Sequence, residues 1–124
     1  MKLIDIVNLV NGNVLCGDEK LNCEIEKAFA SDLMSDVLTI PTENIILVTG
    51  LANLQTIRTA EMSDINYVLL VRNKKATKEM ILLAKENQLV LIESPYSMFR
   101  VCGILSNNGL KHVFWVVEGI YCFI

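Results

Sequence analysis

The chain has 124 residues, of which 52% are hydrophobic and only 6% aromatic, and a formal net charge of −3 at pH 7. This length fits a single domain over 1–124 with an aliphatic core. A mildly acidic chain without a basic stripe lacks the charge pattern of nucleic-acid-binding proteins, so no nucleic acid is expected as a partner.

The first third of the chain predicts short elements and a less regular structure. Apolar residues at helical spacing predict a first helix, which ends at Asn11 and Gly12. Ser31 and Asp32 carry short oxygen-bearing side chains that suit the start of a helix, because they accept hydrogen bonds from free backbone N–H groups. The predicted elements are a helix over 2–10, strands over 14–16 and 23–30, and a short helix over 33–38.

From Ile45 onward, strands and helices alternate. The strands are apolar throughout, so both of their faces are expected to be buried, which requires helices on both sides of a parallel sheet. The sequence therefore predicts an α/β fold, a three-layer α/β/α sandwich with a largely parallel central sheet. Asn53, Thr77 and Ser97 are the expected N-caps. The predicted strands cover 45–48, 67–71 and 89–92, and the helices that follow them cover 54–63, 77–86 and 98–106.

The C-terminal tail, 111–124, differs in composition from the rest. It holds half of the chain's aromatic residues: Phe114, Trp115, Tyr121 and Phe123. One interpretation is one or two extra strands that turn at 118–119 and pack on the core. The other is an apolar patch that a partner covers, because large exposed apolar patches mark interfaces.

No set of residues in the sequence predicts catalysis. Neither a phosphate-binding P-loop nor a dinucleotide-binding glycine pattern is present. The single histidine, His112, leaves little chance of a paired nucleophile and base. The four cysteines, at 16, 23, 102 and 122, do not have metal-site or dithiol spacing. We therefore expect no enzyme activity, no cofactor and no metal.

Two acids, Asp32 and Asp36, share one face of the predicted short helix. They suit a cation, but also a solvated position near a helix N-terminus, which favours negative charge without any ligand. No window reaches the run of about 18 apolar residues that a membrane helix needs. Asp5 interrupts what would be the apolar run of a signal peptide. We expect a cytoplasmic, reduced protein that does not enter a membrane.

The carboxyl ends of the strands are the predicted ligand site, because open parallel sheets bind ligands there. Arg72 is the most informative residue, since a fixed positive charge after a buried strand suits a phosphate or a carboxylate. An ion pair with a surface acid such as Glu93 is the alternative. The candidate ligand-binding residues are Ser31, Asp32, Thr49, Gly50, Arg72 and Ser94.

Several stretches together resemble the DRTGG domain family, from about residue 2 to Leu110. They are the stretches Phe29-Ala30-Ser31-Asp32-Leu33-Met34-Ser35-Asp36-Val37-Leu38, Thr49-Gly50-Leu51, Ile57-Arg58-Thr59-Ala60-Glu61-Met62, Ala84-Lys85-Glu86-Asn87, Tyr96-Ser97-Met98-Phe99 and Cys102-Gly103. The five-residue string that names the family is absent, and the tail after Lys111 has no counterpart in it. The resemblance implies a fold like the N-terminal domain of HPr kinase/phosphorylase. It also implies the role of an accessory domain, like those found beside CBS domains in regulated pyrophosphatases. Members of this family have no agreed catalytic activity and are often located at dimer interfaces.

The resemblance and the missing catalytic sets predict a stand-alone bacterial regulatory domain, non-catalytic, that forms a homodimer and acts through an unknown partner protein. Phe114, Trp115, Tyr121 and Phe123 are the candidate interface residues. The alternative is a sensor of a small ligand, a nucleotide or another anion, at the strand ends. An enzyme is least favoured, because the P-loop of HPr kinase lies in its other domain and has no match here.

Overall fold

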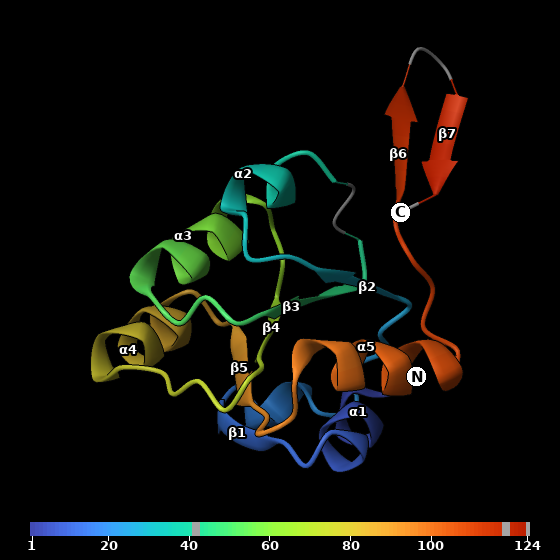
Figure 1. Cartoon of the computed structure of the whole chain (residues 1–124). Coiled ribbons are helices and arrows are strands. Elements are labelled where there is room, and N and C mark those ends of the chain that lie inside the picture. Colours follow the sequence, from blue (N-terminus) through green and yellow to red (C-terminus); the bar gives the residue numbers. More distant parts are fainter. Residues whose placement is uncertain (41–42, 118–119, 124) are drawn as a thin grey trace.

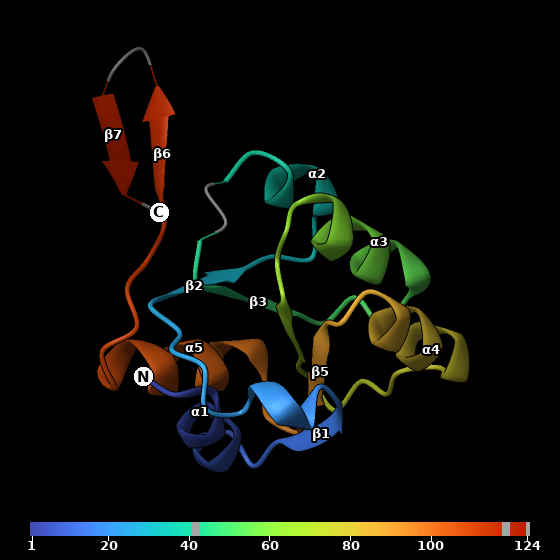
Figure 2. The same cartoon turned by 180° about the vertical axis from the view of Figure 1, so that it is seen from behind.

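The computed structural model describes residues 1–40, 43–117 and 120–123, with side chains up to Val113. Figures 1 and 2 show a sheet with helices on both faces and a hairpin at the C-terminal end. In chain order the elements are α1 (Leu3–Leu9), β1 (Asn13–Cys16), the 3₁₀ helix η1 (Asp18–Lys20), β2 (Lys27–Ala30), α2 (Met34–Val37), β3 (Ile45–Thr49), α3 (Leu54–Met62), β4 (Tyr67–Leu70), α4 (Lys78–Glu86), β5 (Val90–Glu93), α5 (Met98–Asn107), β6 (Phe114–Val117) and β7 (Ile120–Phe123).

The central sheet has five strands in the order β1-β5-β4-β3-β2. Strands β2 to β5 are parallel, and β1 joins the edge of β5 in the antiparallel direction. In register, Thr49 lies beside Leu70 and Leu70 lies beside Glu93, so the carboxyl ends of the parallel strands meet at one edge. The predicted α/β sandwich with a largely parallel sheet is confirmed.

Alternation along the strands builds two apolar cores, one on each face of the sheet. Leu47 and Leu70 point to the face covered by α2, α3 and α4. Val48 and Leu69 point to the other face, which is covered by α1 and α5. Each strand therefore buries both of its faces, which explains why the strands are apolar at every position.

The three predicted N-caps hold the helices of the parallel half. Asn53, Thr77 and Ser97 each accept a hydrogen bond from the backbone N–H three residues on, at 3.1, 3.2 and 3.2 Å. An N-cap of this kind contributes about 1 kcal/mol, because it satisfies a backbone donor that has no partner within the helix.

The first third is more regular than its sequence indicates. Its two strands, β1 and β2, are the two edges of the central sheet. The strand predicted over 23–30 is shorter, since β2 begins at Lys27. The helix start predicted at Ser31 and Asp32 is also wrong: α2 has Leu33 at its N-cap position, without a side-chain hydrogen bond.

The tail forms β6 and β7, a separate two-stranded antiparallel sheet in which Trp115 lies opposite Cys122. In both views this hairpin extends away from the five-stranded sheet. The turn predicted at 118–119 lies outside the described residues. None of the helices in the described part of the chain is long and apolar enough to cross a membrane.

Candidate functional site

The six candidate ligand residues lie at the carboxyl ends of four neighbouring strands. We call this edge the strand-end rim. Ser31 and Asp32 follow β2, Gly50 follows β3, Arg72 lies two residues after β4, and Ser94 follows β5; Thr49 is the last residue of β3. The geometry expected from a parallel sheet is therefore present.

Asp32 is the centre of the hydrogen-bond network on the rim. Its Oδ1 accepts from Thr49 Oγ1 at 3.0 Å and from the Gly50 backbone N–H at 2.7 Å. Its Oδ2 lies 3.0 Å from Arg72 Nη2. These donors are nearer and stronger than the free N–H groups of a one-turn helix, which explains why Asp32 does not cap α2.

Gly50 leaves the room that the Arg72 side chain occupies. A Cβ atom at Gly50 would overlap the Arg72 guanidinium group. The absence of a side chain at this position therefore lets the guanidinium cross the end of β3 and reach Asp32.

The loop after β4 holds Arg72 through its backbone. Arg72 and Asn73 have φ angles of 60° and 57°, in the left-handed region that costs about 1–2 kcal/mol for an L-residue. The Arg72 N–H donates to Tyr96 O at 2.7 Å, and the Asn73 N–H donates to Ser94 O at 3.2 Å. These two bonds to the segment after β5 offset the cost of the left-handed loop.

The structure shows the alternative for Arg72, an ion pair with a surface acid, but the acid is Asp32 and not Glu93. Glu93 accepts from the Ala76 backbone N–H at 2.7 Å and lies 3.8 Å from Lys75 Nζ. Its carboxylate is thus directed to the loop before α4, whereas the Arg72 side chain runs toward β3.

The remaining rim residues serve the fold. Ser94 is buried, donates to Val10 O at 2.7 Å and accepts from the Tyr96 backbone N–H at 3.2 Å. Ser31 Oγ accepts from the Leu33 backbone N–H at 3.0 Å. Of the six candidates, Arg72 alone presents a half-exposed cation, with 48% of its side chain accessible.

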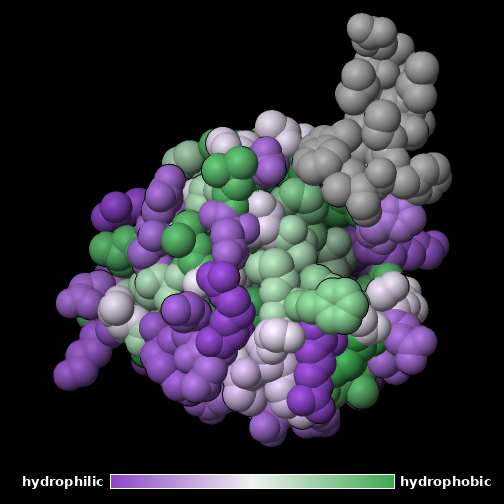
Figure 3. Space-filling view, viewed as in Figure 1, coloured by the Kyte–Doolittle hydropathy of each residue, from purple (hydrophilic) through white to green (hydrophobic). Residues whose placement is uncertain are grey.

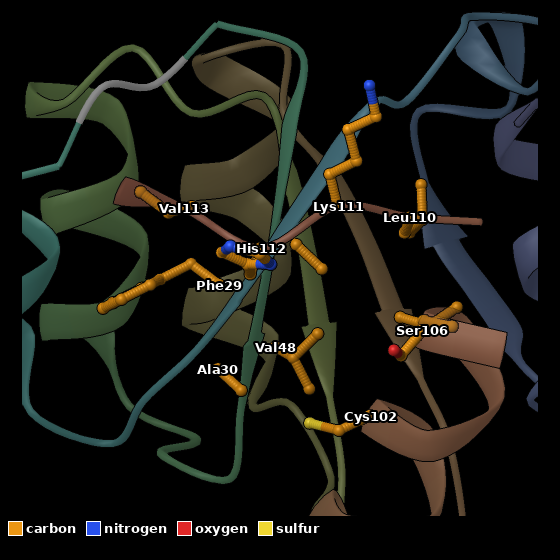
Figure 4. Close-up of a pocket in the computed structure, with 11 residues that line it drawn as sticks. Phe29, Ala30, Val48, Cys102, Ser106, Leu110, Lys111, His112 and Val113 are labelled. Carbon is orange, nitrogen blue, oxygen red and sulfur yellow. The ribbon is translucent and has the colours of Figure 1, made fainter. Parts of the chain in front are cut away.

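A second site, absent from the predictions, lies between α5 and the edge strand β2. We call it the α5–β2 groove (Figure 4). It has a volume of about 370 Å³. Ala28 and Ala30 of β2 line it together with Val48 of β3, and the small alanine side chains leave space there. The full lining is Ala28, Phe29, Ala30, Val48, Cys102, Leu105, Ser106, Leu110, Lys111, His112 and Val113.

The chemistry of the groove does not resemble that of a catalytic centre. Cys102 and His112 both line it, but burial raises the pKa of the Cys102 thiol, the opposite of what an activated thiolate needs. Cys16 is buried against Leu89 O, and burial raises its pKa as well. In 1–40, 43–117 and 120–123 no three metal-ligating side chains gather, so Asp32 and Asp36 have no further ligand there.

Comparison with known proteins identifies the fold. No family model matches the chain, and no curated protein matches it. A similar solved structure is that of the CBS and DRTGG domains of the regulatory region of Clostridium perfringens pyrophosphatase, complexed with its activator diadenosine tetraphosphate. The two chains are 14% identical with a TM-score of 0.72, and the match covers 89% of this chain and 50% of that one.

This chain thus spans half the length of the pyrophosphatase fragment. The likeness supports the fold that the DRTGG resemblance implies, whereas membership of that family stays a prediction. The chain has the α/β fold of part of a pyrophosphatase regulatory region.

Proposed function

We propose that this chain is a non-catalytic regulatory domain of the bacterial cytoplasm, which forms a homodimer and acts through a partner protein. The observation that carries the proposal is the outer edge of β2, where Lys111 is the one backbone hydrogen-bond partner among the described residues, next to the apolar α5–β2 groove. The similar structure is named as a regulatory region, which supports a regulatory role.

The edge of β2 offers backbone groups to another strand. On its outer side the Ala28 N–H donates to Lys111 O at 3.0 Å, and Glu26 O accepts from the Lys111 N–H at 3.0 Å. Since N–H and C=O groups alternate between the two sides of a strand, Ala28 O and the Ala30 N–H also face outward, beyond the reach of Lys111. An open edge of this kind pairs readily with a second chain.

Apolar surface surrounds this edge. Phe99, one helical turn before Cys102 on α5, is 90% exposed. Leu33 and Leu38 flank α2 and are also exposed. Figure 3 shows a band of apolar surface between α2 and α5. Burial of such a band in a dimer removes apolar surface from water, which favours association against the cost of ordering the two chains.

The test uses the outward N–H of Ala30. Ala30→Pro removes this donor without removing a bond to β3, because proline is tolerated where the N–H of an edge strand faces outward. Light scattering on the full chain is expected to give a dimer for the wild type and for Ala30→Ser, and a monomer for Ala30→Pro. A monomeric wild type, or an unaffected dimer of a folded Ala30→Pro, contradicts the proposal.

A second candidate function is a sensor of an anionic ligand at the strand-end rim. The specific observation is the Asp32 carboxylate, which takes hydrogen bonds from Thr49 and Gly50 and an ion pair from Arg72. Thr49 Oγ1, the Gly50 N–H and the Arg72 guanidinium therefore suit an oxyanion. A ligand that binds them takes the place of the Asp32 carboxylate. The nucleotide named in the similar structure makes a nucleotide one such ligand.

Thermal unfolding with adenine nucleotides, inorganic phosphate and organic acids tests the sensor. A ligand at 100 times its dissociation constant adds about 2.7 kcal/mol to the free energy of unfolding. The sensor predicts such a shift in the wild type and none in Arg72→Ala. No shift with any of these compounds, or an equal shift in Arg72→Ala, contradicts it.

A further inference from the structure

We propose that in the dimer the β6–β7 hairpin of each copy docks in the α5–β2 groove of the other. This inference rests on the proposed self-association and names its contact. The occupant of the groove is then the aromatic tail of a second copy of the chain.

The hairpin needs a partner surface. All eight residues of its strands are apolar, Phe-Trp-Val-Val in β6 and Ile-Tyr-Cys-Phe in β7. A two-stranded hairpin alone in water is marginally stable at best. Contact with an apolar surface therefore stabilises it.

The groove provides an apolar floor and a pairing edge side by side. Ala30 and Val48 line it on the side of the sheet, and Cys102 and Ser106 line it on the side of α5. The outward-facing Ala28 O and Ala30 N–H lie along the β2 edge of this groove. An inserted hairpin would add β6 or β7 to the sheet beyond β2 and place apolar side chains over the small alanines.

The chain itself already uses the other half of this edge. Lys111 forms a parallel bridge with Lys27, immediately before the hairpin begins. The pairing of the tail with β2 thus starts within one copy, and the remaining edge is directly adjacent. A second chain that pairs there continues an existing contact.

The anchoring of 110–113 favours exchange between copies over docking within one. Leu110 is buried in the core beneath α1 and α5, whereas Val113 is buried in the core beneath α2, α3 and α4. Residues 110–113 therefore cross the edge of the sheet from one face to the other. The hairpin begins directly after Val113, which is buried on the face opposite α5. In both views it leads away from its own sheet. In a two-fold dimer, each hairpin meets the same surface of the other copy.

A charge placed in the groove tests the contact. Ser106→Glu puts a carboxylate on the exposed wall of the groove, whereas Asn107→Glu puts the same charge on the same last turn of α5, outside the lining. The two variants carry the same charge near the same helix end, so their effects on folding match. We expect Ser106→Glu to weaken dimerisation by about tenfold or more, and Asn107→Glu by less than about twofold.

Trp115, the single tryptophan of the chain, reports on the hairpin in the same samples. We expect its emission to shift to longer wavelength as the wild type is diluted from dimer to monomer. In Ser106→Glu the same shift is expected at a higher protein concentration than in the wild type. A dimer that Ser106→Glu leaves unchanged overturns the inference but not self-association. A monomer at every concentration overturns both. Emission that stays at short wavelength in the monomer shows docking within one chain and overturns the exchange.

Discussion

Asp32 and Arg72 form an ion pair of 3.0 Å that joins the loop after β2 to the loop after β4, across the end of β3 between them. Both side chains are largely accessible to water, 40% for Asp32 and 48% for Arg72, so the ion pair alone contributes about 0–1 kcal/mol. The Asp32 carboxylate contributes more than this ion pair, because it also accepts hydrogen bonds from Thr49 and Gly50. The Asp32 carboxylate thus connects the ends of three strands of the strand-end rim.

Asp32→Asn is expected to lower the free energy of unfolding by about 1–2 kcal/mol. The amide keeps an acceptor but loses the charge that strengthens the three contacts. Urea unfolding of the full chain measures the change. Asp36→Asn, four residues on in α2, is the matched control and is expected to change stability by less than about 0.5 kcal/mol. Equal losses in both variants would show that Asp32 has no special role.

Gly50→Ala is expected to act through Arg72. The added methyl group takes the place of the guanidinium, which then moves away from Asp32. We expect a loss of about 1 kcal/mol. In a double-mutant cycle with Arg72→Ala, the added loss from Gly50→Ala is expected to be close to zero. Additive losses would show that the two positions act independently.

The parallel half of the fold was predictable because its signals are local. Apolar runs such as 45–48, and the caps Asn53, Thr77 and Ser97, depend on neighbouring residues in sequence, and the structure confirms them. The position of the rim followed from the same logic, since parallel strands align their carboxyl ends.

The rest depends on contacts between residues distant in sequence. Asp32 fits a helix start by local rules, yet the donors of Thr49 and Gly50, 17 and 18 residues away, attract its carboxylate. Arg72 pairs with Asp32 rather than Glu93 because its left-handed backbone directs the side chain toward β3. The α5–β2 groove had no sequence signal, since it exists through the small size of Ala28 and Ala30 at an edge strand.

Tyr67 is expected to titrate late. Burial, with a smaller contribution from a hydrogen bond to Cys23, raises its pKa from 10.0 to about 12. The folded state therefore keeps a proton that the unfolded state loses, and the stability this provides is present below pH 10 and lost as the pH rises toward 12. Ultraviolet titration is expected to show one tyrosine ionising after the others, and Tyr67→Phe to remove that step. Ionisation of every tyrosine near pH 10 would contradict this.

Cys102 is expected to react slowly with alkylating reagents. Burial raises its pKa, whereas Cys23 is exposed, and the proposed docking of the hairpin would cover Cys102 further. Mass spectrometry of peptides labelled at neutral pH compares the two thiols in one sample. We expect labelling of Cys102 to slow further as protein concentration rises, while Cys23 is unaffected. Equal rates at every concentration would exclude cover over the α5–β2 groove.

Sedimentation equilibrium of the full wild-type chain over a dilution series tests self-association most directly. The chain has a mass of 13.9 kDa. We predict a weight-average mass that rises with concentration from this value to twice this value, with Ser106→Glu shifted to higher concentration and Asn107→Glu unchanged. A mass that stays at 13.9 kDa up to the highest concentration would contradict the proposed function.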